Sequence, residues 1–273
     1  MPPRSRRAAL RDKLFFKWAA GVKRIVGLPA PDVRSAPRVN PETSLYEAEF
    51  DRLARSIAEI GDAATKDPAN WDLRLTASER QVARTALGDL AGKPLVVCGP
   101  GTKMQAKDWG QENWRELLRR VAASYRGYGF AIVGAQEDSS AGDFVLRELT
   151  GPKLNLCGRL TPRETAAVLE YGSIFLGPDS GPMHLAACVG VPCVIAFSAR
   201  GLPGVWFPAG QNHKVVYHRV SCFGCNLDTC TIEARRCLSS ITVDEMAAAV
   251  HDVLSRTNLT AGSIRISRDV EFS

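Results

Sequence analysis

Long apolar segments are missing from this 273-residue sequence. No run approaches the roughly 20 apolar residues of a membrane-spanning helix, and the apolar stretch at residues 14–22 is interrupted by Lys17. We also find no secretory signal, internal repeat or low-complexity tract. These absences argue against an integral membrane protein, a secreted protein and a repeat array. We therefore expect a soluble, cytoplasmic protein.

A clear metal-binding pattern is also missing, although the chain has 8 cysteines. Four are scattered through apolar runs (Cys98, Cys157, Cys188, Cys193) and four are clustered (Cys222, Cys225, Cys230, Cys237). Without a secretory signal the even number does not argue for disulfides. The cluster reads C-x2-C-x4-C-x6-C, which has one C-x2-C pair but lacks the second pair of a typical zinc site. We consider structural zinc unlikely here, prefer reduced cysteines folding a compact loop, and expect no metal and no cofactor.

The composition is that of a globular protein, with 45% hydrophobic and 23% charged residues. The length fits one large or two small domains. An excess of 35 Lys and Arg over 29 Asp and Glu gives a net charge of +6. This charge favours a phosphate-rich or anionic partner, and nothing in the sequence requires nucleic acid. Basic residues gather at the N-terminus (Arg4, Arg6, Arg7, Arg11, Lys13), as in a solvated tail or a segment weakly attracted to an anionic membrane.

Helix signals begin in the first part of the chain. One amphipathic helix is predicted around residues 13–26, followed by a Pro-punctuated linker. Ser44 and Glu47 have capping-box spacing and predict a helix that ends at Gly61. Thr76 with Glu79 opens a second predicted helix, which ends near Gly92.

From Pro94 onward apolar runs alternate with helical segments. The runs are PLVVC, FAIVG, LNLC, SIFLG and PCVIAF, and helices are predicted to begin near Gln111, Ser140, Pro162 and Gly181. Thr161 with Glu164, and Thr242 with Glu245, repeat the capping box. This alternation predicts an α/β fold with a parallel sheet, preceded by a mainly helical N-terminal part.

Two loops of this α/β region carry the residues suited to binding phosphate. In doubly wound sheets, ligands lie beyond the carboxyl ends of the strands, where loops lead into helix N-termini. The first loop, residues 98–114, contains Thr102, Lys103 and Lys107. It is not a dinucleotide fingerprint, because Met104 occupies the third glycine position of G-x-G-x-x-G. The second loop, residues 177–192, offers polar groups and helix amides that suit a diphosphate.

At these loops the sequence resembles glycosyltransferase family 9, the heptosyltransferases. LGPDSGPMHLAACVGVPCVIAF is similar to the family's D-[ST]-G-x-x-H-L-A-A motif. Upstream, Gly101, Lys107 and Trp109 resemble its "pG.....K.W" segment, with Thr102 directly after the glycine. The resemblance covers residues 93–254.

The resemblance implies a GT-B-type fold, in which a Rossmann-like domain with helices on both faces holds a nucleotide-diphospho-sugar without a metal. Its implied donor-binding residues are Gly101, Thr102, Lys103 and Lys107 near the phosphates, Glu137 or Asp138 near the ribose, Leu160 beside the base, and Asp179, Ser180, Gly181 and His184 near the sugar and diphosphate. Lys107 would also stabilise the leaving group. Read without the resemblance, Asp179 is an ordinary turn residue, His184 a packed helix residue, and Trp109 and Trp114 core residues.

The implied reaction is an inverting transfer of the sugar to a lipopolysaccharide or another surface-glycan acceptor. Family members begin with an acceptor domain whose glycine-rich loop carries the catalytic base, and we find no such loop here. We therefore expect residues 1–92 to be a remnant of that domain, 93–259 the nucleotide-sugar-binding domain, and 260–273 a tail with strand-like alternation or disorder. The base would come from elsewhere. The alternative is a non-catalytic nucleotide-sugar-binding module or a degenerate transferase.

Overall fold

The computed structural model describes residues 6–26 and 36–264, which form two compact units. The first unit comprises Met1–Asn70 together with Leu202–Phe207, and the second comprises Trp71–Gly201 with the rest of the chain from Pro208. The second unit thus starts before residue 93, where we predicted the nucleotide-sugar-binding domain to begin. The functional division of the chain stays a prediction.

Short helices make up the first unit: α1 (Arg6–Leu14), the π-helix η1 (Phe15–Ala19), α2 (Glu49–Ser56), and the 3-10 turns η2 (Ala58–Ile60) and η3 (Pro68–Trp71). The helix expected at residues 13–26 therefore lies earlier, at residues 6–19. Of the basic N-terminal residues, Arg4 lies outside the described residues.

The predicted Ser44–Glu47 capping box is wrong. Ala48 is the N-cap of α2, and Ser44 has a positive φ of 56°. The Glu47 carboxylate instead forms a 2.7 Å ion pair with Arg55, which lowers the pKa of Glu47. Arg55 lies eight residues along the chain, the Glu47 carboxylate also accepts from the Arg38 amide, and the Ser44 amide donates to the Asn40 carbonyl.

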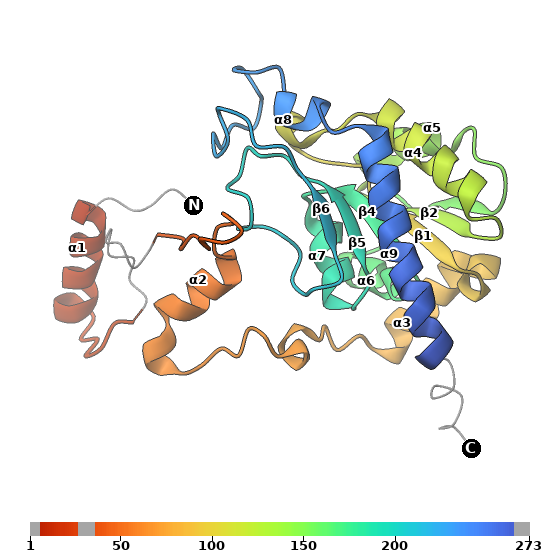
Figure 1. The fold of residues 1–273 in the computed structure, drawn as a ribbon. Helices are drawn as coiled ribbons and strands as arrows, with labels where there is room; N and C mark the ends of the chain where they lie inside the picture. The colour runs from red at the N-terminus through yellow and green to blue at the C-terminus, as the bar shows by residue number, and fades with distance from the viewer. Residues whose placement is uncertain (1–5, 27–35, 265–273) are drawn as a thin grey trace. The chain divides into compact units, whose positions relative to one another are not determined.

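A parallel six-stranded sheet forms the centre of the second unit (Figure 1), in the order β3-β2-β1-β4-β5-β6. The strands are β1 (Leu95–Cys98), β2 (Gly129–Ile132), β3 (Lys153–Asn155), β4 (Ile174–Pro178), β5 (Cys193–Ala196) and β6 (Lys214–Val216). The five predicted apolar runs are the first five strands. β1, β2, β4 and β5 are buried at every residue, as expected for strands covered on both faces.

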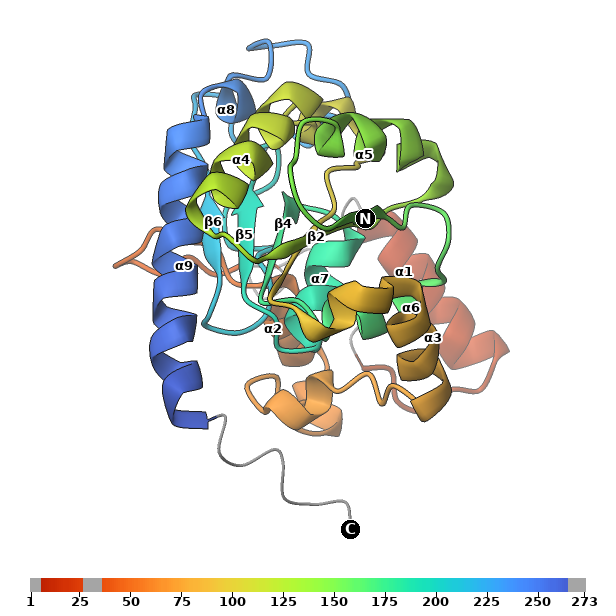
Figure 2. The same cartoon turned by 90° about the vertical axis from the view of Figure 1, so that its right-hand side faces the viewer.

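Helices cover both faces of this sheet, as Figure 2 shows. One face is covered by α4 (Gln111–Ser124), α5 (Ser139–Leu146) and α9 (Val243–Ile264), whose apolar residues join alternate strand residues such as Val96, Cys98 and Ile132 in one core. The other face is covered by α3 (Ala77–Leu87), α6 (Pro162–Leu169) and α7 (Gly181–Cys188). The short helix α8 (Arg236–Ser239) precedes α9. Further 3-10 turns are η4 (Gly88–Gly92), η5 (Gln105–Lys107) and η6 (Gln136–Asp138).

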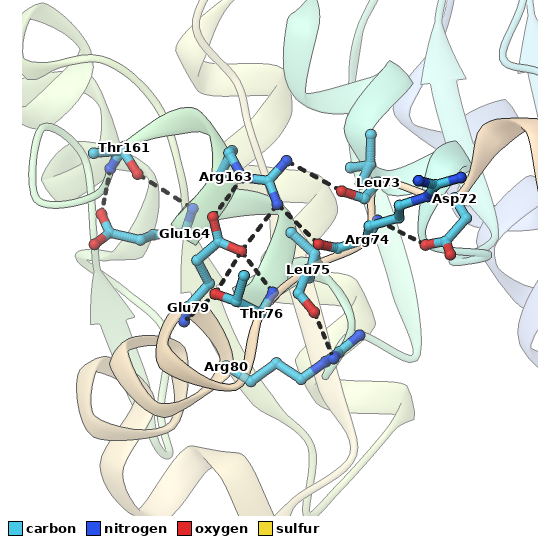
Figure 3. A network of polar contacts seen from close by, with 10 residues as sticks. All are labelled: Asp72, Leu73, Arg74, Leu75, Thr76, Glu79, Arg80, Thr161, Arg163 and Glu164. Atoms are coloured by element: carbon cyan, nitrogen blue, oxygen red, sulfur yellow. Dashed lines mark hydrogen bonds and ion pairs between the residues drawn. The ribbon is translucent and has the colours of Figure 1, made fainter.

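Three of the predicted capping boxes are confirmed, at Thr76, Thr161 and Thr242. The first two lie close together, because Arg163 of α6 donates to the Glu79 carboxylate and to the carbonyls of Leu73 and Arg74 (Figure 3). The Arg163 hydrogen bond is the main reason that the pKa of Glu79 falls to about 2. Side-chain hydrogen bonds thereby fasten α3 to α6.

At the C-terminal end, α9 continues to Ile264. The strand-like alternation or disorder expected from residue 260 is therefore wrong for residues 260–264, whose backbone is helical, and residues 265–273 lie outside the described part.

Candidate functional site

The direction of the strand order changes where β1 and β4 lie side by side. After β1 the chain passes through η5 into α4 on one face, and after β4 it enters α7 on the other face. Loops that diverge from neighbouring parallel strands leave room for a ligand at the carboxyl edge of the sheet. The two loops selected from the sequence are the two that meet there.

A buried ion pair joins these loops. Lys107 Nζ lies 2.7 Å from Asp179 Oδ2 and donates to the Asp179 backbone carbonyl at 3.1 Å. Only 16% of the Lys107 side chain and 8% of the Asp179 side chain are exposed. The ammonium is thus held against the loop that follows β4.

His184 lies within electrostatic reach of both partners. Burial lowers the pKa of its imidazole, the Asp179 carboxylate opposes this, and the Lys107 ammonium adds to it. The net shift of this pKa is downward, which favours the neutral imidazole. The structure thus brings Lys107 to Asp179 and His184, although Lys107 lies 72 positions before Asp179 in the sequence.

The N-terminus of α7 opens next to this pair. Ser180 is the N-cap residue, yet its hydroxyl makes no capping hydrogen bond. Its Oγ is shielded from solvent and has no hydrogen-bond partner among the described residues. A Cβ added at Gly181 would meet no atom within 4 Å. The first turn of α7 therefore presents an unused hydroxyl, helix amides and open space.

The loops after β1 and β2 touch at Gly101. A Cβ there would lie 2.3–2.4 Å from the Asp138 carboxylate, so only glycine fits. Asp138 Oδ2 also accepts from the Ala135 amide at 2.9 Å, while Glu137 is exposed. Of the two carboxylates considered for the ribose, Asp138 faces the β1 loop.

The remaining predicted donor residues lie around this edge. Thr102 Oγ1 accepts from the Met104 amide at 3.3 Å, and Lys103 is exposed. Leu160 is partly buried beyond the end of β3. Trp109 and Trp114 are core residues with only 4% and 1% exposure, in an edge-to-face pair.

Comparison with known proteins places the whole chain in a family. The family model of glycosyltransferase family 9 (heptosyltransferase) matches residues 48–235. The chain belongs to glycosyltransferase family 9. Among curated relatives, it is 22% identical to lipooligosaccharide heptosyltransferase 2 of Campylobacter jejuni over 170 residues, covering 62% of this chain and 53% of the relative. It is 29% identical to lipopolysaccharide heptosyltransferase 3 of Escherichia coli over 111 residues, covering 40% and 32%.

Solved structures of the family share the fold. The family 9 glycosyl transferase of Veillonella parvula has a TM-score of 0.68 at 18% identity, over 80% of this chain and 62% of that chain. E. coli ADP-heptose lps heptosyltransferase II has a TM-score of 0.64 at 17% identity, over 94% and 76%. At identities this low, the structural likeness shows the fold alone, which is GT-B-like and α/β. The chain spans about half the length of the first curated relative that it matches.

The sequence did not predict the contacts that distant segments of this family 9 chain make with η5. Ser198 Oγ donates to the Ala106 carbonyl at 2.6 Å, and the Ala106 amide donates to the Asp228 carbonyl at 3.0 Å. Asp228 belongs to the segment from Cys222 to Cys237, here named the cysteine-rich loop. These contacts join backbone groups of Ala106 to residues more than 90 positions away, so no local sequence pattern predicts them.

All four cysteines of the cysteine-rich loop are free thiols, as are the other four. Over residues 6–26 and 36–264, no group of three or more His, Cys, Asp or Glu side chains is arranged to hold a metal ion. Within the same ranges, no helix is both long enough and apolar enough to span a membrane.

Proposed function

We propose that the carboxyl edge of the sheet, where the β1 and β4 loops meet, binds a nucleotide-diphospho-sugar as the donor of a glycosyl transfer. The observation that carries this proposal is the buried Lys107–Asp179 pair beside the open N-terminus of α7. An ammonium and a helix N-terminus are both favourable to a diphosphate. The unused Ser180 hydroxyl adds a hydrogen-bond donor at the same place.

Lys107 has two roles in this proposal. It neutralises the bound diphosphate, and it stabilises the additional negative charge as the bond between the anomeric carbon and the diphosphate oxygen breaks. Removing one such preorganised donor typically costs on the order of 100-fold in rate or more. Asp179 holds Lys107 in place, and neutral His184 is suited to hydrogen bonding with the sugar.

The rest of the donor site follows the same edge. Gly101, Thr102 and Lys103 would approach the phosphates, Asp138 or Glu137 the ribose, and Leu160 the base. The proposed transfer needs no metal and no other cofactor.

The name of the E. coli structural neighbour contains ADP-heptose, and the curated relatives are named for lipopolysaccharide or lipooligosaccharide. We therefore propose an ADP-activated heptose as the donor and a lipid-linked surface glycan as the acceptor. An acceptor hydroxyl would attack the anomeric carbon with inversion. The protein would work in the cytoplasm, where the basic residues of α1, such as Arg7 and Arg11, would favour weak contact with an anionic membrane.

A non-catalytic nucleotide-sugar-binding module is the second candidate. It is favoured by the pairing of Asp179, whose carboxylate is occupied by Lys107 and so is not placed to act as a base. Transfer would then depend on a base supplied from outside this site.

Calorimetric titration of the chain with ADP, UDP and GDP tests the donor site. We expect saturable binding of one nucleotide that Lys107→Ala weakens at least tenfold. Lys93→Ala is the matched control, because Lys93 is exposed at the opposite end of β1. Binding by none of the three nucleotides, or equal weakening by both variants, would refute the donor site. Release of ADP from ADP-heptose only when acceptor is present distinguishes the transferase from the binding module.

A further inference from the structure

The segment that carries Lys107 has little support of its own. η5 is a single 3-10 turn of three residues, Gln105–Lys107, between β1 and α4. Its local hydrogen bonds are Lys107 to the Met104 carbonyl at 2.9 Å and Asp108 to the Gln105 carbonyl at 3.2 Å. Short 3-10 turns have poor hydrogen-bond geometry, so this turn depends on contacts from elsewhere, while the Lys107 ammonium itself is held by Asp179.

Those contacts come from the cysteine-rich loop. The Cys230 amide donates to Gln105 Oε1 at 3.0 Å, and the Ala106 amide donates to the Asp228 carbonyl at 3.0 Å. Arg235 Nη1 donates to the Asp108 carbonyl at 2.9 Å and lies 3.6 Å from Asp108 Oδ2. The three residues of 105–108 that flank Lys107 are therefore all tied to one loop more than 120 positions away.

Within this loop, Arg235 contributes a charged side chain, which contacts Asp108 directly after η5. Its backbone is left-handed, with φ at 61°, a conformation that glycine adopts at lower cost. Its amide donates to Cys230 Sγ at 3.2 Å, which fixes the point from which the guanidinium reaches Asp108. Arginine is a costly residue in this conformation. The Cys230 thiol holds its backbone there while its side chain contacts Asp108, so we attribute the arginine to this contact and not to the turn.

We propose that Arg235 is a positioning residue, which orders the Lys107 segment so that the ammonium is ready for the donor diphosphate. Arg235 acts through residues 105–108 and does not itself touch the donor. The effect on donor binding rests on the function proposed above, whereas the ordering of residues 105–108 does not.

The first test is hydrogen–deuterium exchange of the full chain, followed in peptides that cover residues 104–109. Arg235→Ala and Arg235→Gly should both speed exchange of these amides. The glycine variant relieves the left-handed backbone, so a loosened segment in that variant is due to the missing guanidinium. Arg236→Ala is the matched control, because Arg236 is 63% exposed and pairs with Glu233. Unchanged exchange in both Arg235 variants would overturn the proposal.

The second test is a double-mutant cycle on ADP binding measured by calorimetry. Arg235→Ala should weaken binding about tenfold, Arg235→Lys less, and Arg236→Ala not at all. In the Lys107→Ala background, the Arg235→Ala effect should shrink to less than about twofold. A full tenfold loss in that background would refute action through Lys107. If the unmodified chain binds none of ADP, UDP and GDP, the proposed function fails, while the exchange experiment still decides whether Arg235 orders the segment.

Discussion

Replacing Lys107 by Met tests the physical basis of the donor site, because it leaves the Asp179 carboxylate alone in a nearly dry position. The Asp179 side chain is only 8% exposed, and its carboxylate lies 2.7 Å from the Lys107 ammonium. Removing one partner of a buried pair costs about 3–5 kcal/mol, because the remaining charge is uncompensated. Since 16% of the Lys107 side chain is exposed, we expect a smaller loss of about 2–3 kcal/mol in the free energy of unfolding.

Adding Asp179→Asn to the Lys107→Met variant should restore much of the lost free energy of unfolding. In the double variant neither charge remains, so the unfolding free energy should recover by about 1–2 kcal/mol relative to Lys107→Met alone. Urea unfolding followed by circular dichroism and tryptophan fluorescence measures all four proteins of the cycle. If the effect of the double variant equals the sum of the two single effects to within about 0.5 kcal/mol, the residues are not coupled and the argument from the buried pair is wrong.

Two further predictions concern the scaffold of the site. The pKa of Glu79 is lowered from 4.5 to about 2, so the stability that its contacts provide should be fully present above pH 4.5 and lost as the pH falls toward 2. Melting temperatures measured across this range should fall less steeply for Glu79→Gln than for the unmodified chain, and parallel curves would contradict the assignment. Gly101→Ala should destabilise the fold by about 1–3 kcal/mol, because its Cβ would overlap the Asp138 carboxylate. Gly181→Ala, which meets open space, is the control, and equal stability of the two variants in urea would show that the Gly101 contact is not tight.

Much of the second unit was readable from local sequence. Short apolar runs, which are buried at every residue of β1, β2, β4 and β5, predicted the main strands, and the capping boxes at Thr76, Thr161 and Thr242 predicted three helix starts. Capping boxes can be predicted from the sequence because the N-cap residue and its hydrogen-bond partner are only three residues apart. At Ser44 the spacing was misleading, because the helix begins only at Glu49 and the Glu47 carboxylate pairs with Arg55 instead. The strand β6 was not predicted, although β3, which is equally short and equally exposed, lies in the predicted run LNLC.

The residue types of the donor site were also present in the sequence, in the loops that carry Lys107, Asp179 and His184. What sequence alone determined was that each loop follows a buried strand and leads into a helix, because strand and helix periodicity are local properties of the chain. Only the tertiary structure decided that Lys107 pairs with Asp179, that Asp138 rather than Glu137 faces Gly101, and that Arg235 holds Asp108. Those contacts depend on strand order and on the path of the cysteine-rich loop, which are set by packing between residues far apart in the chain.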